Sequence, residues 1–182
     1  MIKVLAFDFV GVLGYEKDVE MTEIEEKLER MYGPIINDEK YFKVGRRYIN
    51  NDDTIIRITK NLINRLYGIR YKNLFQKIKE LYPDIKVVIA TNHVSYIREF
   101  LEKRFDIKYL DDIIISAEIN KAKPNDDFYE YILEKYNIKP NELLFIDDRE
   151  ENVDAAINLG INAIKYNSRE MDLLETVLDL IK

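Results

Sequence analysis

Five short apolar runs, separated by segments with helical periodicity, constrain the fold of this chain more than any other feature of its sequence. The runs are apolar along most of their length rather than alternating, which is typical of parallel strands buried on both faces. The segments between them repeat apolar residues every three or four positions, as one face of a helix requires. This alternation predicts an α/β fold with a Rossmann-like, doubly wound parallel sheet. The predicted strands are residues 4–8, 86–91, 113–116, 143–147 and 162–166.

The end of the chain continues this pattern with one more helix. We expect it to begin near Ser168 and to close the core, with Met171, Leu174, Val177 and Ile181 facing inward. Residues 15–71 break the rhythm, because they contain helical patterns and no convincing strand. We therefore predict an α/β core of residues 1–14 and 72–182 and a helical cap of residues 15–71 over the mouth of the sheet.

Two helix starts can be read inside the predicted cap. Thr22 and Glu25 have the spacing of a capping box, and Gly33-Pro34 would end the helix that follows. Either Asp52 or Asp53 is expected to cap a second helix, which would end near residue 68. A helical cap of this size would shape the entrance to any site at the end of the sheet.

Composition limits the chemistry that the chain can perform. It contains no Cys and a single His, so a bound metal must be held mainly by oxygen ligands, which favours magnesium or calcium. A net charge of −6 with scattered basic residues argues against a nucleic-acid partner. The apolar runs are too short to span a membrane, and the start does not resemble a secretory leader. We therefore expect a soluble, cytoplasmic protein, and the sequence leaves its oligomeric state open.

Reactive side chains follow three of the predicted strands. In a doubly wound sheet, ligands bind beyond the carboxyl ends of the strands, where Asp8, Thr91 and the pair Asp147 and Asp148 fall. The pair directly follows an apolar run of residues, which predicts a buried position. Two adjacent carboxylates at a buried edge destabilise the fold unless a cation is present. The alternative is a solvated pair at a strand end. We favour a metal site.

The other polar residues also have structural alternatives. Thr91 and Asn92 could cap a helix that begins near Val94, although the same N–H groups that need a cap also bind phosphate. Lys123 could be an ordinary surface lysine, as Lys121 could be. Only the order and spacing of the whole set distinguish a site from these separate explanations.

Four segments together resemble the motifs of the haloacid dehalogenase superfamily. They are FDFVGVL with Asp8, VIATN with Thr91 and Asn92, KAKPNDDFY with Lys123, and FIDDREENVDAA with the acid pair. They occur in the family's order and at the predicted strand ends. The resemblance covers residues 4–13 and 86–166 and leaves the cap unmatched. It is closest to members with a short helical cap between the first two motifs, which include small-molecule phosphatases and dehalogenases.

The resemblance implies an attack on a small phosphorylated substrate. Asp8 would be the nucleophile and would form an aspartyl-phosphate, while Lys123 would neutralise charge on Asp8 and on the phosphoryl group. Such charge compensation is needed because a carboxylate and a phosphate repel each other. The Thr91 hydroxyl and the Asn92 backbone N–H would bind phosphoryl oxygens at a helix N-terminus.

The resemblance also implies Mg²⁺ as the cofactor. Its ligands would be Asp8, the carbonyl of Val10, Asp148 directly, and Asp147 directly or through water. Asn152 resembles the family position that braces the metal-binding loop. A helix-start asparagine explains its presence equally well.

The chain departs from the family's phosphatases at Val10. They usually carry an Asp two residues after the nucleophile, which protonates the leaving oxygen, and Val10 has no proton to give. Such acid–base catalysis is worth about 10²–10⁴-fold, so we expect aryl and acyl phosphates to be favoured over sugar phosphates. His93, the only His, could supply the proton or could simply lie in the first turn of a helix.

Two other functions remain alternatives. A non-catalytic phosphate- or metabolite-binding protein could keep the fold, the metal and the pocket, and a 2-haloacid dehalogenase could use Asp8. Dehalogenases need no metal and lack the paired acids, which argues against them, and receiver domains place these residue types in a different order. In the cap, Arg46 and Arg47 could reach an anionic substrate, although a solvated basic turn is the simpler interpretation.

Overall fold

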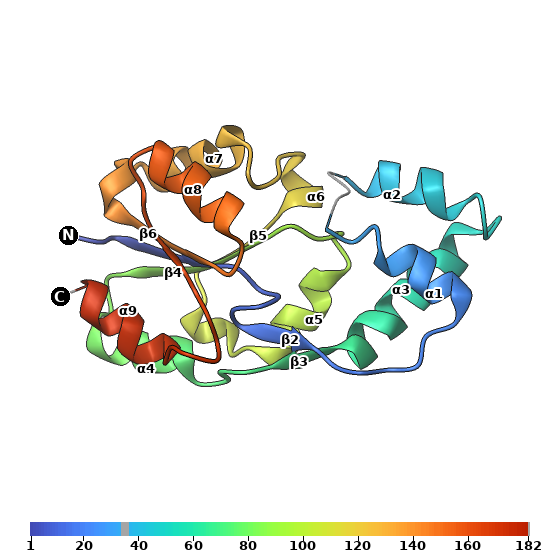
Figure 1. The fold of residues 1–182 in the computed structure, drawn as a ribbon, viewed down its shortest axis with the longest axis horizontal. Coiled ribbons are helices and arrows are strands. Elements are labelled where there is room, and N and C mark those ends of the chain that lie inside the picture. The colour runs from blue at the N-terminus through green and yellow to red at the C-terminus, as the bar shows by residue number, and fades with distance from the viewer. Residues whose placement is uncertain (34–36, 182) are drawn as a thin grey trace.

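A five-stranded parallel sheet lies between two layers of helices (Figure 1). The computed structural model describes residues 1–33 and 37–181. The strand order is β5-β4-β1-β6-β7, so β1 is central and pairs with β4 and β6. This confirms the predicted doubly wound α/β fold, and every predicted strand is correct to within one residue at each end. The strands are β1 (Val4–Phe7), β4 (Lys86–Thr91), β5 (Asp112–Ile115), β6 (Leu143–Asp147) and β7 (Asn162–Lys165).

Both faces of the sheet are buried, which explains why the strands are apolar along their length. Leu5 and Phe7 point into one apolar core, whereas Val4 and Ala6 point into the other. Burying each large apolar side chain is worth roughly 1.5–3 kcal/mol, so both layers stabilise the sheet. The first core is covered by α4 (Leu74–Leu81), α5 (Ile97–Arg104) and α9 (Leu173–Ile181), and the second by α7 (Asp126–Tyr136) and α8 (Glu150–Asn158).

Three short helical segments complete the connections of the core. They are η1 (Ile107–Tyr109), α6 (Ser116–Ile119) and η2 (Pro140–Glu142). The last helix, α9, begins at Leu173 rather than near Ser168 and also buries Leu173 fully, while Met171 and Leu174 are half-buried and pack against the same core as predicted. The Asp172 side chain accepts a hydrogen bond from the Glu175 N–H at 2.9 Å and so caps the shorter helix. Val177 and Ile181 are buried as expected.

The insertion contains two strands that the sequence did not predict. Its three helices lie at the right of Figure 1 and are α1 (Glu23–Glu29), α2 (Asp38–Gly45) and α3 (Asp52–Leu66). Along the chain they follow β2 (Gly14–Glu16) and precede β3 (Tyr67–Ile69). The two strands pair antiparallel, with Gly14 opposite Ile69 and Glu16 opposite Tyr67. Three-residue strands are too short to show an alternating pattern. The division into core and cap remains a prediction.

The helix starts in the insertion were predicted in part. The capping box is present, since the Thr22 N–H donates to Glu25 Oε2 at 2.9 Å and the Thr22 hydroxyl accepts from the Glu25 N–H at 3.3 Å. Helix α1 ends at Glu29. The predicted stop at Gly33-Pro34 falls partly on Pro34, which lies outside the described residues.

The cap of α3 is Asn51 rather than Asp52 or Asp53. The Asn51 side chain accepts a hydrogen bond from the Thr54 N–H at 2.8 Å, which places both aspartates inside the first helical turn. There their negative charge is favourable beside the exposed N–H groups. The helix ends at Leu66 rather than near residue 68, because the chain continues directly into β3.

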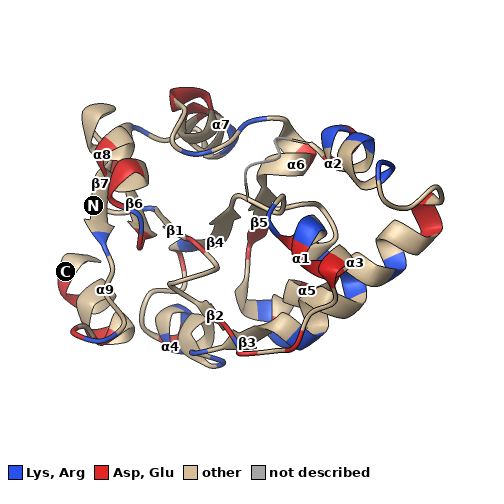
Figure 2. Cartoon of the chain, turned by 45° about the vertical axis from the view of Figure 1, so that its right-hand side comes forward, with Lys and Arg blue, Asp and Glu red and all other residues tan. Residues whose placement is uncertain are grey.

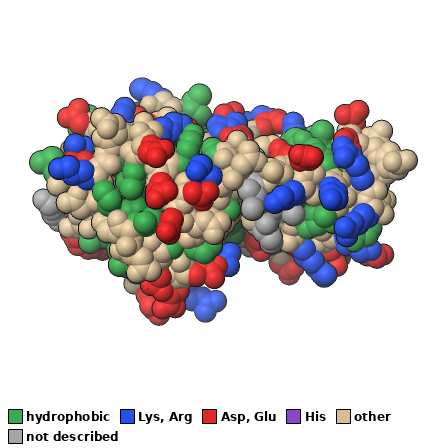
Figure 3. Space-filling model, turned by 90° about the horizontal axis from the view of Figure 1, so that it is seen from above, with side chains coloured by type: hydrophobic (Ala, Val, Ile, Leu, Met, Phe, Trp, Pro, Cys, Tyr) green, Lys and Arg blue, Asp and Glu red, His purple; other side chains and the backbone are tan. Residues whose placement is uncertain are grey.

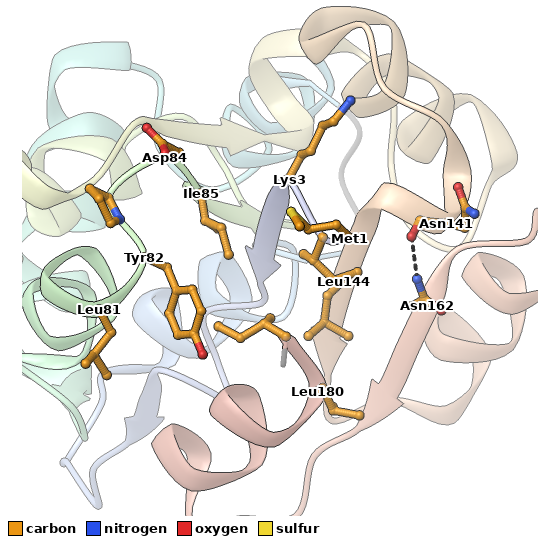
Figure 4. Close-up of a pocket in the computed structure, with 13 residues that line it drawn as sticks. Met1, Lys3, Leu81, Tyr82, Asp84, Ile85, Asn141, Leu144, Asn162 and Leu180 are labelled. Atoms are coloured by element: carbon orange, nitrogen blue, oxygen red, sulfur yellow. Dashed lines mark hydrogen bonds between the residues drawn. The ribbon is translucent and has the colours of Figure 1, made fainter.

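A hollow of about 1000 Å³ lies at the amino-terminal edge of the sheet (Figure 4). Its lining is largely apolar and includes Met1, Leu81, Tyr82 and Leu180, with Lys3 at the side. It is the larger of the two hollows described here, but it lies at the opposite end of the strands from Asp8. Its lining contains neither Asp8, which follows β1, nor the acid pair at the end of β6.

The exterior of the described residues shows no membrane-crossing element. No helix among them is both long and apolar enough to pass through a bilayer. In the face shown in Figure 3, acidic and basic side chains are intermixed, with basic ones closer together at the right-hand end. The intermixing agrees with the scattered charge expected from the sequence.

Candidate active site

The carboxyl ends of three adjacent strands bring the predicted site residues together. Asp8 directly follows β1, while Thr91 ends β4 and Asp147 ends β6 on either side of it. The Asp8 N–H donates to the Ile146 carbonyl at 2.8 Å, which fixes the end of β1 against β6. A cavity of about 280 Å³ opens at this edge. Its core-side lining includes Asp8, Val10, Thr91, Asn92, Lys123 and Asp148.

Lys123 occupies the centre of the cluster. Its ammonium donates to Asp8 Oδ1 and to Asp147 Oδ2, both at 2.7 Å, and to the Ala90 carbonyl at 2.9 Å. Its side chain is only 1% exposed, so the surface-lysine interpretation is wrong. An ammonium has three donors, and all three have acceptors here. A buried charge that is paired in this way is tolerated, whereas an unpaired one would be costly.

The acids of the cluster exceed its positive charge. Burial raises the pKa of Asp8 to about 7, with Lys123 opposing the rise and Asp147 adding to it. Burial alone would lower the pKa of Lys123. The negative charges of Asp8 and Asp147 have the larger combined effect and raise this pKa above its usual value. Burial, followed by the charge of Asp147, also raises the pKa of Asp148. One lysine faces three carboxyl groups, so the site favours an additional cation.

The carboxyl oxygens fit a hard divalent cation. Oxygen atoms of Asp8, Asp147 and Asp148 lie within 4.8 Å of one another. Asp148 Oδ1 is buried and has no hydrogen-bond partner among the described residues, so it is free to bind a metal. Both oxygens of Asp147 already accept hydrogen bonds, from Asn152 and Lys123 among others. An all-oxygen set suits Mg²⁺, with Asp148 as the better direct ligand.

Gly11 and Asn152 support the acids from behind. A Cβ atom at Gly11 would lie 2.2 Å from Asp148 Oδ2, and Gly11 has a φ of +95°, which L side chains rarely adopt. This close approach has no local signal in the sequence. The Asn152 amide donates to both oxygens of Asp147 at 3.0 and 3.1 Å, from the first turn of α8. Asn152 therefore braces Asp147 from the first turn of the helix, and its side chain does not cap the helix; its role beside a metal stays a prediction.

Thr91 and Asn92 line the cavity but do not lie at a helix N-terminus. The helix expected near Val94 begins only at Ile97, because the chain makes a turn first. The Asn92 side chain instead holds the Lys123 backbone, donating to its carbonyl at 2.8 Å and accepting from its N–H at 3.0 Å. Asn92 thus positions Lys123, a role that the sequence did not predict.

His93 is a buried, neutral residue. Its ring packs against Tyr32 and Tyr67, with centroids 5.0 and 5.6 Å away. The Val94 carbonyl can only accept, so the Nδ1 atom 3.2 Å from it carries the proton, and Nε2 accepts from the Tyr67 hydroxyl at 3.1 Å. Burial lowers the pKa of His93 to about 4. A histidine that is neutral near pH 7 cannot act as the missing acid.

The insertion supplies part of the cavity wall. This part was not predicted from the sequence, because its residues come from α1, β3 and the segments next to them, far in the chain from the motifs of the core. The available signal in the sequence was Glu29, an acid in the last turn of a helix, where its charge interacts unfavourably with the helix dipole. The wall residues are Glu16, Glu29, Arg30, Tyr32, Gly33 and Tyr67.

Arg46 and Arg47 are not among the cavity-lining residues of the described chain. The Arg46 guanidinium pairs with Asp52 at 2.6 Å, and both side chains are exposed. Arg47 is exposed as well. Both side chains are exposed and outside the cavity lining of the described residues, as the solvated basic turn that the sequence favoured requires.

The fold and this cluster together define a Rossmann-like α/β protein with its site at the carboxyl ends of the strands. The chain belongs to the haloacid dehalogenase-like hydrolase family, whose model matches residues 15–166. This confirms the family predicted from the four motifs. The match begins after Asp8, so the role of Asp8 is argued from its position and contacts.

Several curated relatives are phosphatases. A phosphorylated carbohydrates phosphatase from Thermotoga maritima is 31% identical over 111 residues, which cover 59% of this chain and 49% of that protein. A phosphoglycolate phosphatase from Vibrio parahaemolyticus is 22% identical over 87% of this chain and 81% of its own length. A sesquiterpene phosphatase from Aspergillus oryzae is 26% identical over 98% and 94%. The chain thus spans about half the length of the first of these relatives.

Solved structures share the fold over the whole chain. A predicted hydrolase of the same family from Porphyromonas gingivalis has a TM-score of 0.73 and 24% identity, covering 100% of this chain and 98% of that one. A family member from Bacteroides thetaiotaomicron, in complex with magnesium and inorganic phosphate, has a TM-score of 0.70 and 22% identity, covering 97% and 99%. At these identities the likeness establishes the fold.

Proposed function

We propose that this protein is a magnesium-dependent phosphatase that hydrolyses a small phosphate ester through an aspartyl-phosphate at Asp8. The proposal rests on one contact, the hydrogen bond of 2.7 Å that the Lys123 ammonium donates to Asp8 Oδ1. Both residues line a cavity that Thr91 and Asp148 also line. Phosphatases among the relatives support it. The cavity of about 280 Å³ lies just below the range of about 300–1,000 Å³ usual for drug-sized ligands, which favours a small substrate.

The first chemical step follows from how Asp8 is held. Lys123 binds Oδ1 of the carboxylate, which leaves Oδ2 free to attack phosphorus. The Thr91 hydroxyl and the Asn92 N–H would bind two phosphoryl oxygens, and the ammonium of Lys123 would offset the charge gathering there. Water then attacks the phosphorus of the aspartyl-phosphate and releases inorganic phosphate, which restores Asp8.

Asp8, the carbonyl of Val10 and Asp148 would hold Mg²⁺, with Asp147 behind them. When bound, the ion supplies charge neutralisation for the two anions that must meet. This charge requirement also separates the proposal from its alternatives. A 2-haloacid dehalogenase would gain nothing from three clustered carboxyl groups. A non-catalytic phosphate-binding protein would use the same residues, so turnover must decide.

The test compares the native protein with Asp8→Asn on an aryl phosphate in Mg²⁺, with phosphate release as the measurement. We expect turnover by the native protein and its loss in Asp8→Asn, since the amide is a far poorer nucleophile. Asp18→Asn, the same change at an exposed residue, should retain full activity. Phosphate binding without turnover would identify a binding protein instead. Turnover of 2-haloacids alone would identify a dehalogenase.

A further inference from the structure

Glu29 is an acid in the cavity that has no structural partner. It is the last residue of α1 and is partly buried, and it lines the same cavity as Asp8 and Val10. In residues 1–33 and 37–181 its carboxyl group makes no hydrogen bond and no ion pair. Figure 2 marks acidic residues in red, on α1 and along the chain after β2. Glu29 therefore reaches, from the insertion, the cavity that the nucleophile lines from the core.

The stability of the fold does not explain this position. The carbonyl groups at the end of a helix are partly negative, so a carboxylate there is unfavourable. A second acid, Glu16 at the end of β2, lines the same cavity and repels it. An acid that is partly buried, unpaired and close to another acid costs stability. Such residues are found preferentially at functional sites.

Tyr67 lines the same cavity as Glu29 and Asp8 and responds to both charges. Burial first, and then the charges of Glu16, Glu29 and Asp8, raise the pKa of its hydroxyl. Its side chain is buried in the cavity wall. One hydroxyl that responds to all three carboxyl groups lies near each of them. Glu29 and Asp8 thus both line the cavity that a substrate would fill.

The protonation of Glu29 suits a proton donor. Burial raises the pKa of its carboxyl group, Glu16 raises it further, and Arg30 opposes the rise. Tyr67 on β3 and the carboxyl groups of Asp8 and Asp148 line the same cavity. A larger fraction of Glu29 is therefore protonated near neutral pH than of an ordinary glutamate.

We propose that Glu29 is a catalytic residue that donates the proton which Val10 cannot give. The assignment rests on the proposed phosphatase function. Asp8 forms a bond to phosphorus as the bond from phosphorus to the leaving oxygen breaks, and that oxygen takes its electron pair and the proton of Glu29. In the second step, water attacks the aspartyl-phosphate and gives a proton to the Glu29 carboxylate. Asp8 leaves phosphorus as a carboxylate, so both residues return to their starting states.

Other proton donors in the cavity are less suitable. His93 is buried and neutral, and its one N–H is already bonded to the Val94 carbonyl. The three donors of Lys123 are all in use. The Tyr67 hydroxyl donates to His93, and burial raises its pKa further from neutrality. Glu29 is the acid among these that is both free and poised to release a proton.

The inference changes the expectation based on Val10 alone. With Glu29 as donor, the native protein should hydrolyse alkyl phosphates, whose leaving oxygen needs a proton, as well as aryl phosphates, whose oxygen does not. Glu29→Gln should lower kcat for glycerol phosphate by about 10²-fold or more and change kcat for p-nitrophenyl phosphate far less. Glu23→Gln, the same change on an exposed residue of α1, should alter neither.

Two further variants separate proton donation from a structural role. Val10→Asp placed in the Glu29→Gln protein introduces a carboxyl group beside Asp8 and should restore part of the glycerol phosphate turnover. Glu16→Gln removes the charge that raises the pKa of Glu29, so the alkaline limb of the kcat profile for glycerol phosphate should move to lower pH. Thermal unfolding of each variant checks that the fold is retained, and Glu29→Asp keeps the acid on a shorter arm.

The outcomes distinguish this inference from the function on which it rests. If no phosphate ester is turned over, the proposed function fails and the role of Glu29 with it. If p-nitrophenyl phosphate turnover depends on Asp8 but Glu29→Gln leaves the ratio of the two substrates unchanged, only the Glu29 assignment is wrong. A native protein that hydrolyses aryl but not alkyl phosphates would overturn it as well.

Discussion

In the metal-free protein, Asp8→Asn should increase stability at alkaline pH. The native fold raises the pKa of Asp8 from 3.8 to about 7, mainly through burial. Between these two pH values the folded state holds a proton that the unfolded chain has released. Stability must therefore fall as pH rises through this interval, and the full loss is present above about pH 7. Asparagine cannot ionise and avoids the loss.

The size of the effect follows from the pKa change. A shift of about three units corresponds to about 4 kcal/mol of unfolding free energy. Asp8→Asn should thus be close to the native protein in stability at about pH 4 and about 4 kcal/mol more stable at about pH 8. With a urea dependence of about 1–3 kcal/mol per molar, the unfolding midpoint would differ by about 2 M.

The assay is urea unfolding followed by circular dichroism in EDTA across this pH range. The difference between the two proteins is informative, because groups that do not interact with Asp8 titrate alike in both and cancel. Saturating Mg²⁺ should remove the advantage of Asp8→Asn, since the ion stabilises the ionised carboxylate. A stability difference that does not change with pH would refute the idea that burial of Asp8 is uncompensated in the metal-free site.

Three other substitutions test the support of the metal site. Asp148→Ala should abolish the stabilisation by Mg²⁺, which for the native protein is about 2.7 kcal/mol at a Mg²⁺ concentration of 100 times Kd. If calorimetry shows that Asp148→Ala binds Mg²⁺ as tightly as the native protein, the proposed metal site is wrong. Gly11→Ala places a Cβ 2.2 Å from Asp148 Oδ2 and should weaken Mg²⁺ binding about 10-fold or more by titration calorimetry. Asn152→Ala removes both amide contacts to Asp147 and should cost about 1–3 kcal/mol in urea unfolding, where no loss would indicate that Lys123 suffices.

The strands and the core residues of the site were predictable because their signals are local. Continuous apolar runs mark parallel strands, and parallel strands place their carboxyl ends at one edge, so Asp8, Thr91 and Asp147 had to be neighbours. The same reasoning failed where the element is short. The strands β2 and β3 have only three residues each, and their pairing depends on contacts made far apart in the chain.

The roles of single side chains were less predictable than their neighbourhood. Asn92 was expected to offer its backbone N–H, but its side chain also holds the Lys123 backbone, which only the folded loop reveals. Asn51, Asp52 and Asp53 are all good helix caps, so sequence alone could not choose among them. Glu29 belongs to the site only because the insertion packs over the sheet.

The placement of Glu29 on the insertion makes proton donation depend on how the insertion contacts the core. The Asp38 carboxylate on α2 accepts two hydrogen bonds from Ser95, one from its N–H at 3.0 Å and one from its hydroxyl. The Lys60 ammonium on α3 donates to the Glu99 carboxylate on α5 at 2.8 Å. Nucleophile and proton donor are thus held by different parts of the chain, and small displacements at an active site can be costly.

Asp38→Ala removes both bonds to Ser95 and should let the insertion shift relative to Asp8. We expect kcat for glycerol phosphate to fall about 10-fold, less than in Glu29→Gln because the acid is still present, while kcat for p-nitrophenyl phosphate changes little. Glu39→Ala alters the next residue of α2, which is exposed, and should leave kcat for both substrates unchanged. If Asp38→Ala lowers kcat for both substrates equally, the contact of Asp38 with Ser95 supports the nucleophile or the fold rather than the position of the proton donor. If kcat falls for neither substrate, Glu29 reaches the leaving oxygen without this contact, and the contact of Lys60 with Glu99 should be removed next.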